Sequence, residues 1–139
     1  MKKYSTKDSR RQLDIVFDFD GVICKCIQPY DHFKYGKPNK KIINIIKNLH
    51  KDGHTLRLST ARLCPTFGGI PEPDVISGRV RKALIKHLET LGISDCFVEI
   101  TGFKPFGHVY IDDRGLYYDG ENDMEIIDKI RKIANDNKV

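Results

Sequence analysis

The sequence contains no long apolar run. No segment reaches the roughly 20 consecutive apolar residues that a membrane-spanning helix needs, and the amino-terminal stretch has no apolar signal region. We therefore expect a cytoplasmic protein with no membrane partner. Internal repeats and low-complexity stretches are also absent. With 139 residues, the chain is long enough for one domain but not for a second independent core.

Cysteine is scarce and irregularly spaced. The four cysteines form neither a C-x-x-C pair nor the dense spacing of a disulfide scaffold. The five histidines likewise lack the spacing of metal ligands. These absences argue against a zinc site and favour reduced thiols.

The net charge of +5 is moderate and favours anionic ligands without requiring nucleic acid. Much of the excess lies in residues 1–12, which we interpret as a flexible basic arm; its charges are Lys2, Lys3, Lys7, Arg10 and Arg11. The aromatic residues that would stack on bases are not interleaved with the basic ones. Nucleic acid is therefore a possible partner but not the favoured one.

From residue 13 onward, apolar runs alternate with helical patterns, which indicates a single α/β domain over 13–139 with a mainly parallel sheet. Strands are expected at 13–19, 55–60, 96–101 and 107–112, with a short fifth at 116–118. A helix capped by Asn39 should run to residue 51, and Ser77 should cap a second. The last helix should begin near Asn122 and bury four apolar residues: Met124, Ile127, Ile130 and Ile133.

Two segments are expected to form loops. Residues 22–38 show no helical period and contain Pro29, Gly36 and Pro38, so we expect a loop or short lid at the carboxyl end of the first strand. Residues 62–74 are also rich in proline and glycine.

Asp18 and Asp20 end the first apolar strand. Because strand side chains alternate with period 2, both carboxylates should project to the same side. Like charges this close raise each other's pKa, and a bound cation would offset the repulsion. A calcium loop is a poor alternative, because Gly21, Val22 and Ile23 supply no side-chain oxygen ligands.

Other polar residues follow the remaining strands. Ligands of parallel α/β sheets bind outside the carboxyl ends of the strands, so these residues should meet at one edge. They are Ser59, Thr60 and Arg62 after the second strand, Lys104 after the third, and Asp112 and Asp113 after the fourth. This set suits Mg²⁺ together with a phosphoryl group.

The order of these motifs resembles the haloacid dehalogenase (HAD) superfamily, in particular its small phosphatase-like members. The resemblance covers about residues 13–114 and consists of D-F-D-G, L-S-T-A-R, K-P and I-D-D-R in sequence. It implies a three-layer Rossmann-like fold with strand order 5-4-1-2-3, numbered along the chain. It also implies a bound Mg²⁺.

The resemblance further implies a role for each matching residue. Asp18 would be the nucleophile that forms an aspartyl-phosphate, and Asp20 the general acid and base. Thr60, the Ala61 backbone N–H and Lys104 would bind the phosphoryl group, although Ser59 could replace Thr60. The metal ligands would be Asp18, Asp20, Asp112 and Asp113.

Two arginines adjoin these motifs. Arg62 could bind the anionic substrate by a bidentate contact or could anchor the loop that follows, and both roles stay open. For Arg114 we favour a structural ion pair with the acidic residues before it.

The function expected from these features is Mg²⁺-dependent hydrolysis of a phosphomonoester. The chain has no room for a cap domain, which favours an open site and a large substrate such as a phosphorylated macromolecule, or a lid supplied by a second copy in a homo-oligomer. A phosphorylated small molecule remains a candidate. The alternative is a catalytically silent phosphate-binding module; the motif order does not fit a receiver domain.

Overall fold

The computed structural model describes residues 11–136. Most of the expected basic arm, including Lys2, Lys3, Lys7 and Arg10, lies outside the described residues. Arg11 and Gln12 are described and are exposed. Within the described range, no helix is both long and apolar enough to cross a membrane.

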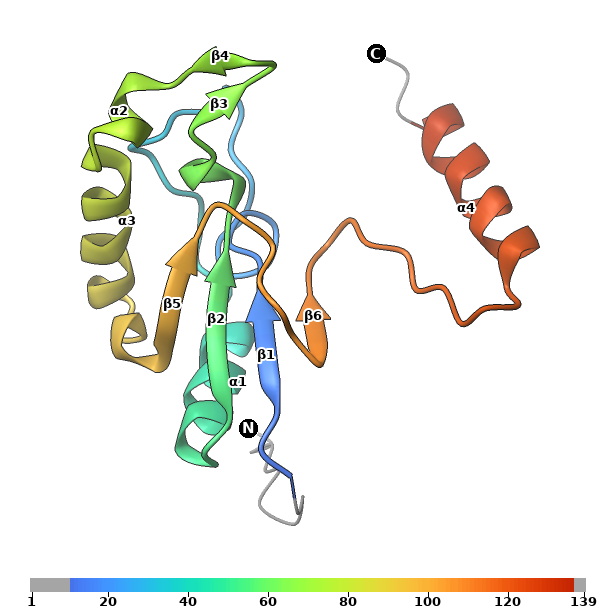
Figure 1. The fold of residues 1–139 in the computed structure, drawn as a ribbon, viewed down its shortest axis with the longest axis horizontal. Helices are drawn as coiled ribbons and strands as arrows, with labels where there is room; N and C mark the ends of the chain where they lie inside the picture. Colours follow the sequence, from blue (N-terminus) through green and yellow to red (C-terminus); the bar gives the residue numbers. More distant parts are fainter. Residues whose placement is uncertain (1–10, 137–139) are drawn as a thin grey trace.

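The centre of the fold is a four-stranded parallel sheet (Figure 1). Its strands are β1 (Asp14–Phe17), β2 (Thr55–Ser59), β5 (Phe97–Thr101) and β6 (Val109–Ile111), in the order β5-β2-β1-β6. The α/β class and the parallel sheet are confirmed. The five-strand order 5-4-1-2-3 is not, because residues 116–118 form no strand; Leu116, Tyr117 and Tyr118 are all exposed and have no core to pack against.

One face of the sheet forms the core. Leu56 and Leu58 of β2 lie in register with Ile15 and Phe17 of β1, and all four side chains are buried. Helices α1 (Lys40–Lys51) and α3 (Arg79–Thr90) cover this face, contributing the fully buried Ile46, Val80, Leu84 and Leu88. The alternation of buried and half-buried residues along β2 matches a strand covered by helices on one face.

The loop between β5 and β6, residues 102–108, covers the opposite face of the sheet. The Ser59 hydroxyl donates a hydrogen bond to the Phe103 carbonyl at 2.8 Å. Gly107 approaches β1 so closely that a Cβ there would lie 2.7 Å from Val16 Cγ2, which explains why Val16 is buried. In the described part of the chain no helix covers this face, so the expected third layer is not found.

The helix ends follow their local capping chemistry. Asn39 caps α1 as expected, since its Oδ1 accepts hydrogen bonds from the backbone N–H groups of Lys41 and Ile42. The expected cap at Ser77 is wrong. Ser77 ends the short helix α2 (Pro73–Ile76), where its hydroxyl donates to the Asp74 carbonyl, and α3 begins after Gly78 instead.

The last helix, α4 (Asp123–Asp136), does not pack on the sheet (Figure 1). The expected burial of four apolar residues is wrong, because they remain 40–63% exposed: Met124, Ile127, Ile130 and Ile133. The extended segment between β6 and α4 leads the chain away from the core. A helical period specifies an apolar face but not the surface that covers it.

The segment after β2 is more ordered than a loop. It contains the 3-10 helix η1 (Ala61–Leu63) and a hairpin of β3 (Thr66–Phe67) and β4 (Ile70–Pro71). Gly68 and Gly69 form the turn with φ angles of 56° and 82°, a left-handed conformation that glycine adopts without strain. This hairpin forms one wall of the cavity described below.

Candidate functional site

The parallel strands bring the motif residues to one edge of the sheet. Asp18, Thr60 and Asp112 follow the carboxyl ends of β1, β2 and β6. The Asp18 N–H donates to the Ile111 carbonyl at 3.0 Å, and the Thr60 N–H donates to the Thr101 carbonyl at 2.9 Å. These bonds continue the pairing of neighbouring strands just past their ends, which fixes the start of each motif.

Asp18 lies at the centre of a group of carboxylates. Burial raises the pKa of Asp18, and the hydrogen bond from the Phe19 N–H to Oδ1, at 2.7 Å, opposes that effect. The charges of Asp113, Asp20 and Asp112 raise the pKa of Asp18 further. The other three predicted acidic residues therefore lie close enough to act electrostatically on Asp18.

The two residues of the second acidic pair, Asp112 and Asp113, make different contacts. Gly21 has φ = 85°, and a Cβ at this position would overlap the Asp113 carboxylate, so Asp113 packs directly on the first motif. Asp112 Oδ1 instead accepts hydrogen bonds from the backbone N–H groups of Arg114 and Gly115, which closes a tight turn.

No group of three or more His, Cys, Asp or Glu side chains within residues 11–136 is arranged to hold a metal ion. Mg²⁺ makes a smaller demand, because it keeps several waters and needs only one or two carboxylates together with a substrate phosphate. The close approach of Asp113 to Gly21, beside Asp18, is compatible with that smaller set.

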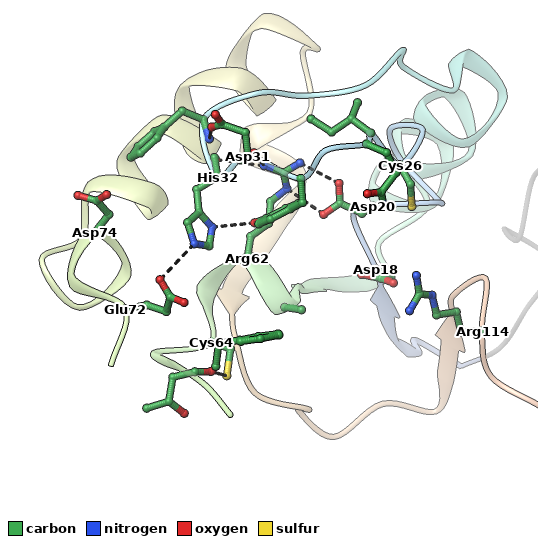
Figure 2. Close-up of a pocket in the computed structure, with 17 residues that line it drawn as sticks. Asp18, Asp20, Cys26, Asp31, His32, Arg62, Cys64, Glu72, Asp74 and Arg114 are labelled. Atoms are coloured by element: carbon green, nitrogen blue, oxygen red, sulfur yellow. Dashed lines mark hydrogen bonds and ion pairs between the residues drawn. The ribbon is translucent and has the colours of Figure 1, made fainter. Parts of the chain in front are cut away.

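Arg62 anchors the first motif to the loop over it (Figure 2). Its Nε donates to Asp20 Oδ2 at 2.8 Å and its Nη2 to Asp20 Oδ1 at 2.9 Å. Its Nη1 donates to the carbonyls of Asp31 and His32, both at 3.1 Å. Arg62 is only 1% exposed, so these four hydrogen bonds compensate for the desolvation of the guanidinium.

Aromatic rings complete the surroundings of Arg62. Its Cζ lies 5.3, 5.0 and 4.8 Å from the ring centroids of Phe19, Tyr30 and Tyr35. Burial alone would lower the pKa of Arg62, but the hydrogen bonds and charge of Asp20 outweigh burial and raise it. Of the two roles left open by the sequence, the anchoring one is seen here.

Thr60 and Ser59 use their hydroxyl groups differently. Thr60 is buried, and its Oγ1 accepts a hydrogen bond of 3.2 Å from the Arg62 N–H, which caps η1. Ser59 donates its hydroxyl hydrogen to the Phe103 carbonyl. Among the described contacts, Thr60 therefore keeps a donor for an anion, whereas Ser59 does not.

Two further basic residues, Lys104 and Arg114, lie near the site, and their described contacts differ from those expected from the sequence. Lys104 Nζ lies 4.7 Å from the Tyr110 ring centroid, and the charges that act on Asp18 come from carboxylates. Arg114 lines the same cavity as Asp18, and in Figure 2 its guanidinium points toward Asp18. No ion pair of Arg114 is described within residues 11–136. Its position directly after the acidic pair was the sequence signal for this placement.

Asp18 and Asp20 line a cavity of about 1050 Å³. The loop expected to act as a lid forms one wall, from Cys26 to Phe33, and the β3–β4 hairpin region forms the other, from Cys64 to Asp74. Asp18, Asp20 and Arg114 lie at one end (Figure 2). Two segments of this chain therefore form the walls of the site.

No protein-family model and no curated protein matches this chain. A solved structure of a conserved protein from Bacteroides thetaiotaomicron is similar, with 20% sequence identity and a TM-score of 0.46. The match covers 93% of this chain and 100% of that one. Likeness of this degree assigns neither a family nor a function.

Proposed function

We propose that this chain is a Mg²⁺-dependent phosphomonoester hydrolase of the HAD type, with a Rossmann-like fold and Asp18 as its nucleophile. The observation that carries the proposal is the placement of Asp18. It is half-buried at the carboxyl edge of a parallel sheet, it lines a cavity, and three further carboxylates act on it. A bound cation would stabilise such a concentration of negative charge.

Mg²⁺ would be held by Asp18 and Asp113, with Asp20 and Asp112 nearby. When bound, the ion would neutralise charge on the phosphoryl oxygens and on the carboxylates. Asp112 contributes in addition by closing the turn that presents Asp113 to Gly21.

Asp18 can attack phosphorus through Oδ2, because Oδ1 is held by the Phe19 N–H. The new bond joins Asp18 Oδ2 to phosphorus while the bond from phosphorus to the leaving oxygen breaks, and Asp20 gives its proton to that oxygen. Water then attacks the aspartyl-phosphate, Asp20 takes the proton of the water, and inorganic phosphate leaves. Each Asp20 oxygen accepts one bond from Arg62 and keeps a second lone pair for this proton.

The remaining residues bind or position. Arg62 is a positioning residue, because it orients Asp20 and holds the loop over the site. Arg114 is the cation best placed to contact a phosphate at Asp18. Lys104 would reach the phosphate only after its side chain leaves the Tyr110 ring.

The alternative is a catalytically silent module that binds phosphate and Mg²⁺. Two observations favour it: Lys104 lies on Tyr110 rather than at Asp18, and both Asp20 oxygens are engaged by Arg62. Such a module would bind both ligands without turnover.

Phosphate release from an aryl phosphate tests the proposal. We expect release with Mg²⁺, none with a chelator, and none from Asp18→Asn. Asp95→Asn is a matched control, because Asp95 is exposed beside the amino end of β5, away from the site. Calorimetric binding of Mg²⁺ and phosphate without release would favour the silent module instead.

A further inference from the structure

Three aromatic residues line the cavity, and they come from both of its walls. Tyr30 and Phe33 come from the loop over the site, and Phe67 comes from the β3–β4 hairpin. Tyr30, Phe33 and Phe67 are 48%, 43% and 78% exposed, so each leaves part of its surface open to a ligand, although Arg62 already lies over the Tyr30 ring. Rings that line a cavity from two separate segments form a surface for a flat apolar ligand.

Hydrogen-bond acceptors lie between these rings. The Tyr30 hydroxyl and His32 Nδ1 are 2.7 Å apart, and His32 Nε2 lies 3.7 Å from Glu72 Oε2 (Figure 2). The Glu72 side chain is 34% exposed, so it retains lone pairs that can accept from a ligand. This chain of polar groups joins the two walls at mid-cavity.

The charge of the lining restricts what can bind there. Five carboxylates line the cavity, namely those of Asp18, Asp20, Asp31, Glu72 and Asp74, against two arginines, of which Arg62 is already paired. Away from the cation expected at Asp18, this wall would repel a second anionic group. These carboxylates favour a ligand group that is neutral and donates hydrogen bonds from N–H.

We infer that the part of the cavity lined by the aromatic residues binds the base of a nucleoside monophosphate whose phosphate lies at Asp18; this inference rests on the proposed function. A nucleobase stacks on aromatic rings and carries N–H donors for acceptors such as Glu72. A cavity of about 1050 Å³ has room for a whole nucleoside monophosphate. The two walls favour a free mononucleotide over the phosphorylated end of a polynucleotide.

Binding is measured by titration calorimetry on Asp18→Asn with Mg²⁺, so that no ligand is consumed. The ligands are the common nucleoside 5′-monophosphates, ribose 5-phosphate and a 5′-phosphorylated trinucleotide. We expect at least one nucleoside monophosphate to bind roughly tenfold more tightly than ribose 5-phosphate, as one stacked base provides. Equal affinities, no binding of any nucleotide, or tighter binding of the trinucleotide would each overturn the inference.

Further substitutions, made in the Asp18→Asn protein, test where the base binds. Phe67→Ala should remove most of the preference for the nucleotide, and it buries too little to endanger folding. Glu72→Gln should weaken nucleotide binding while leaving ribose 5-phosphate binding unchanged. Tyr117→Ala is the matched control, since Tyr117 is 81% exposed outside the cavity. A Phe67→Ala protein with full preference would overturn the inference.

The two proposals can fail separately. If nucleosides without phosphate compete for the site but the wild-type protein releases no phosphate, the base site stands and the hydrolase proposal fails. If the wild-type protein hydrolyses ribose 5-phosphate as efficiently as every nucleotide, the hydrolase stands and the base site is overturned.

Discussion

The guanidinium of Arg62 and the carboxylate of Asp20 form a two-point hydrogen-bonded pair, with donor–acceptor distances of 2.8 and 2.9 Å. The pair joins the segment after β2 to the segment after β1. Through the carbonyls of Asp31 and His32, the same guanidinium also holds the loop that forms one wall of the cavity. Arg62 thus couples the acid–base residue to the shape of the site.

Replacing Arg62 with alanine should therefore destabilise the protein strongly. Asp20 would be left without its partner, and two loop carbonyls would lose their donors. We expect the free energy of unfolding in urea to fall by about 3–5 kcal/mol. Arg62→Lys should restore only part of this, because an ammonium group cannot make the bidentate contact.

A matched control is the exposed pair of Arg79 and Asp74, 3.3 Å apart. Arg79→Ala should change the free energy of unfolding by no more than about 0.5 kcal/mol. Equal effects at Arg62 and Arg79 would contradict the anchoring role of Arg62.

Gly21→Ala should impair the metal site. The added Cβ would collide with the Asp113 carboxylate, and the φ of 85° would strain the backbone. We expect the protein to lose the stabilisation that Mg²⁺ gives to the wild type in thermal unfolding.

Gly120→Ala is the control that measures backbone strain without a collision. Gly120 has φ = 95°, but an added Cβ would have no atom within 4 Å. The substitution should cost about 1–2 kcal/mol from backbone strain alone and keep the full Mg²⁺ effect. If Gly21→Ala also kept that effect, Asp113 would not belong to the metal site.

Asp18→Asn should stabilise the metal-free protein. The pKa of Asp18 is raised above 3.8 by burial and by its acidic neighbours, so the folded state holds this proton more tightly than the unfolded state. Ionisation of Asp18 therefore lowers stability as pH rises through the interval above 3.8. Thermal unfolding across pH should show the variant's advantage grow through this interval and then level off, whereas a constant difference would contradict the shift.

Ending the chain after Asp119 should leave the fold largely intact. Most apolar side chains of helix α4 are exposed, and the helix contributes no residue to the buried core. We expect the free energy of unfolding to change by less than about 1 kcal/mol in urea denaturation. A loss of several kcal/mol would mean that α4 packs on the core in solution.

The elements that sequence could predict are those specified by local patterns. The helix after Asn39 has both a capping side chain and an apolar face. The strand before Asp18 contains an apolar run, and the strand before Thr60 alternates polar and apolar residues. Because neighbouring strands of the central sheet are parallel, the carboxyl-edge placement of Asp18 and Asp112 followed from the strand pattern alone.

Other features depend on contacts between distant residues. Arg62 could not be assigned a role because its partner, Asp20, lies 42 positions earlier in the chain. Ser77 is a favourable cap by type, but its hydroxyl bonds back to the Asp74 carbonyl three residues before it. The apolar period of α4 gave no information about a partner surface.

Mass spectrometry of the wild-type protein, acid-quenched during reaction with Mg²⁺ and a phosphorylated substrate, tests the central claim most directly. We predict a phosphoryl group on Asp18 that disappears with a chelator and is absent from Asp18→Asn. Phosphate release that proceeds at the wild-type rate in Asp18→Asn, or a phosphoryl group on another residue, would contradict the account.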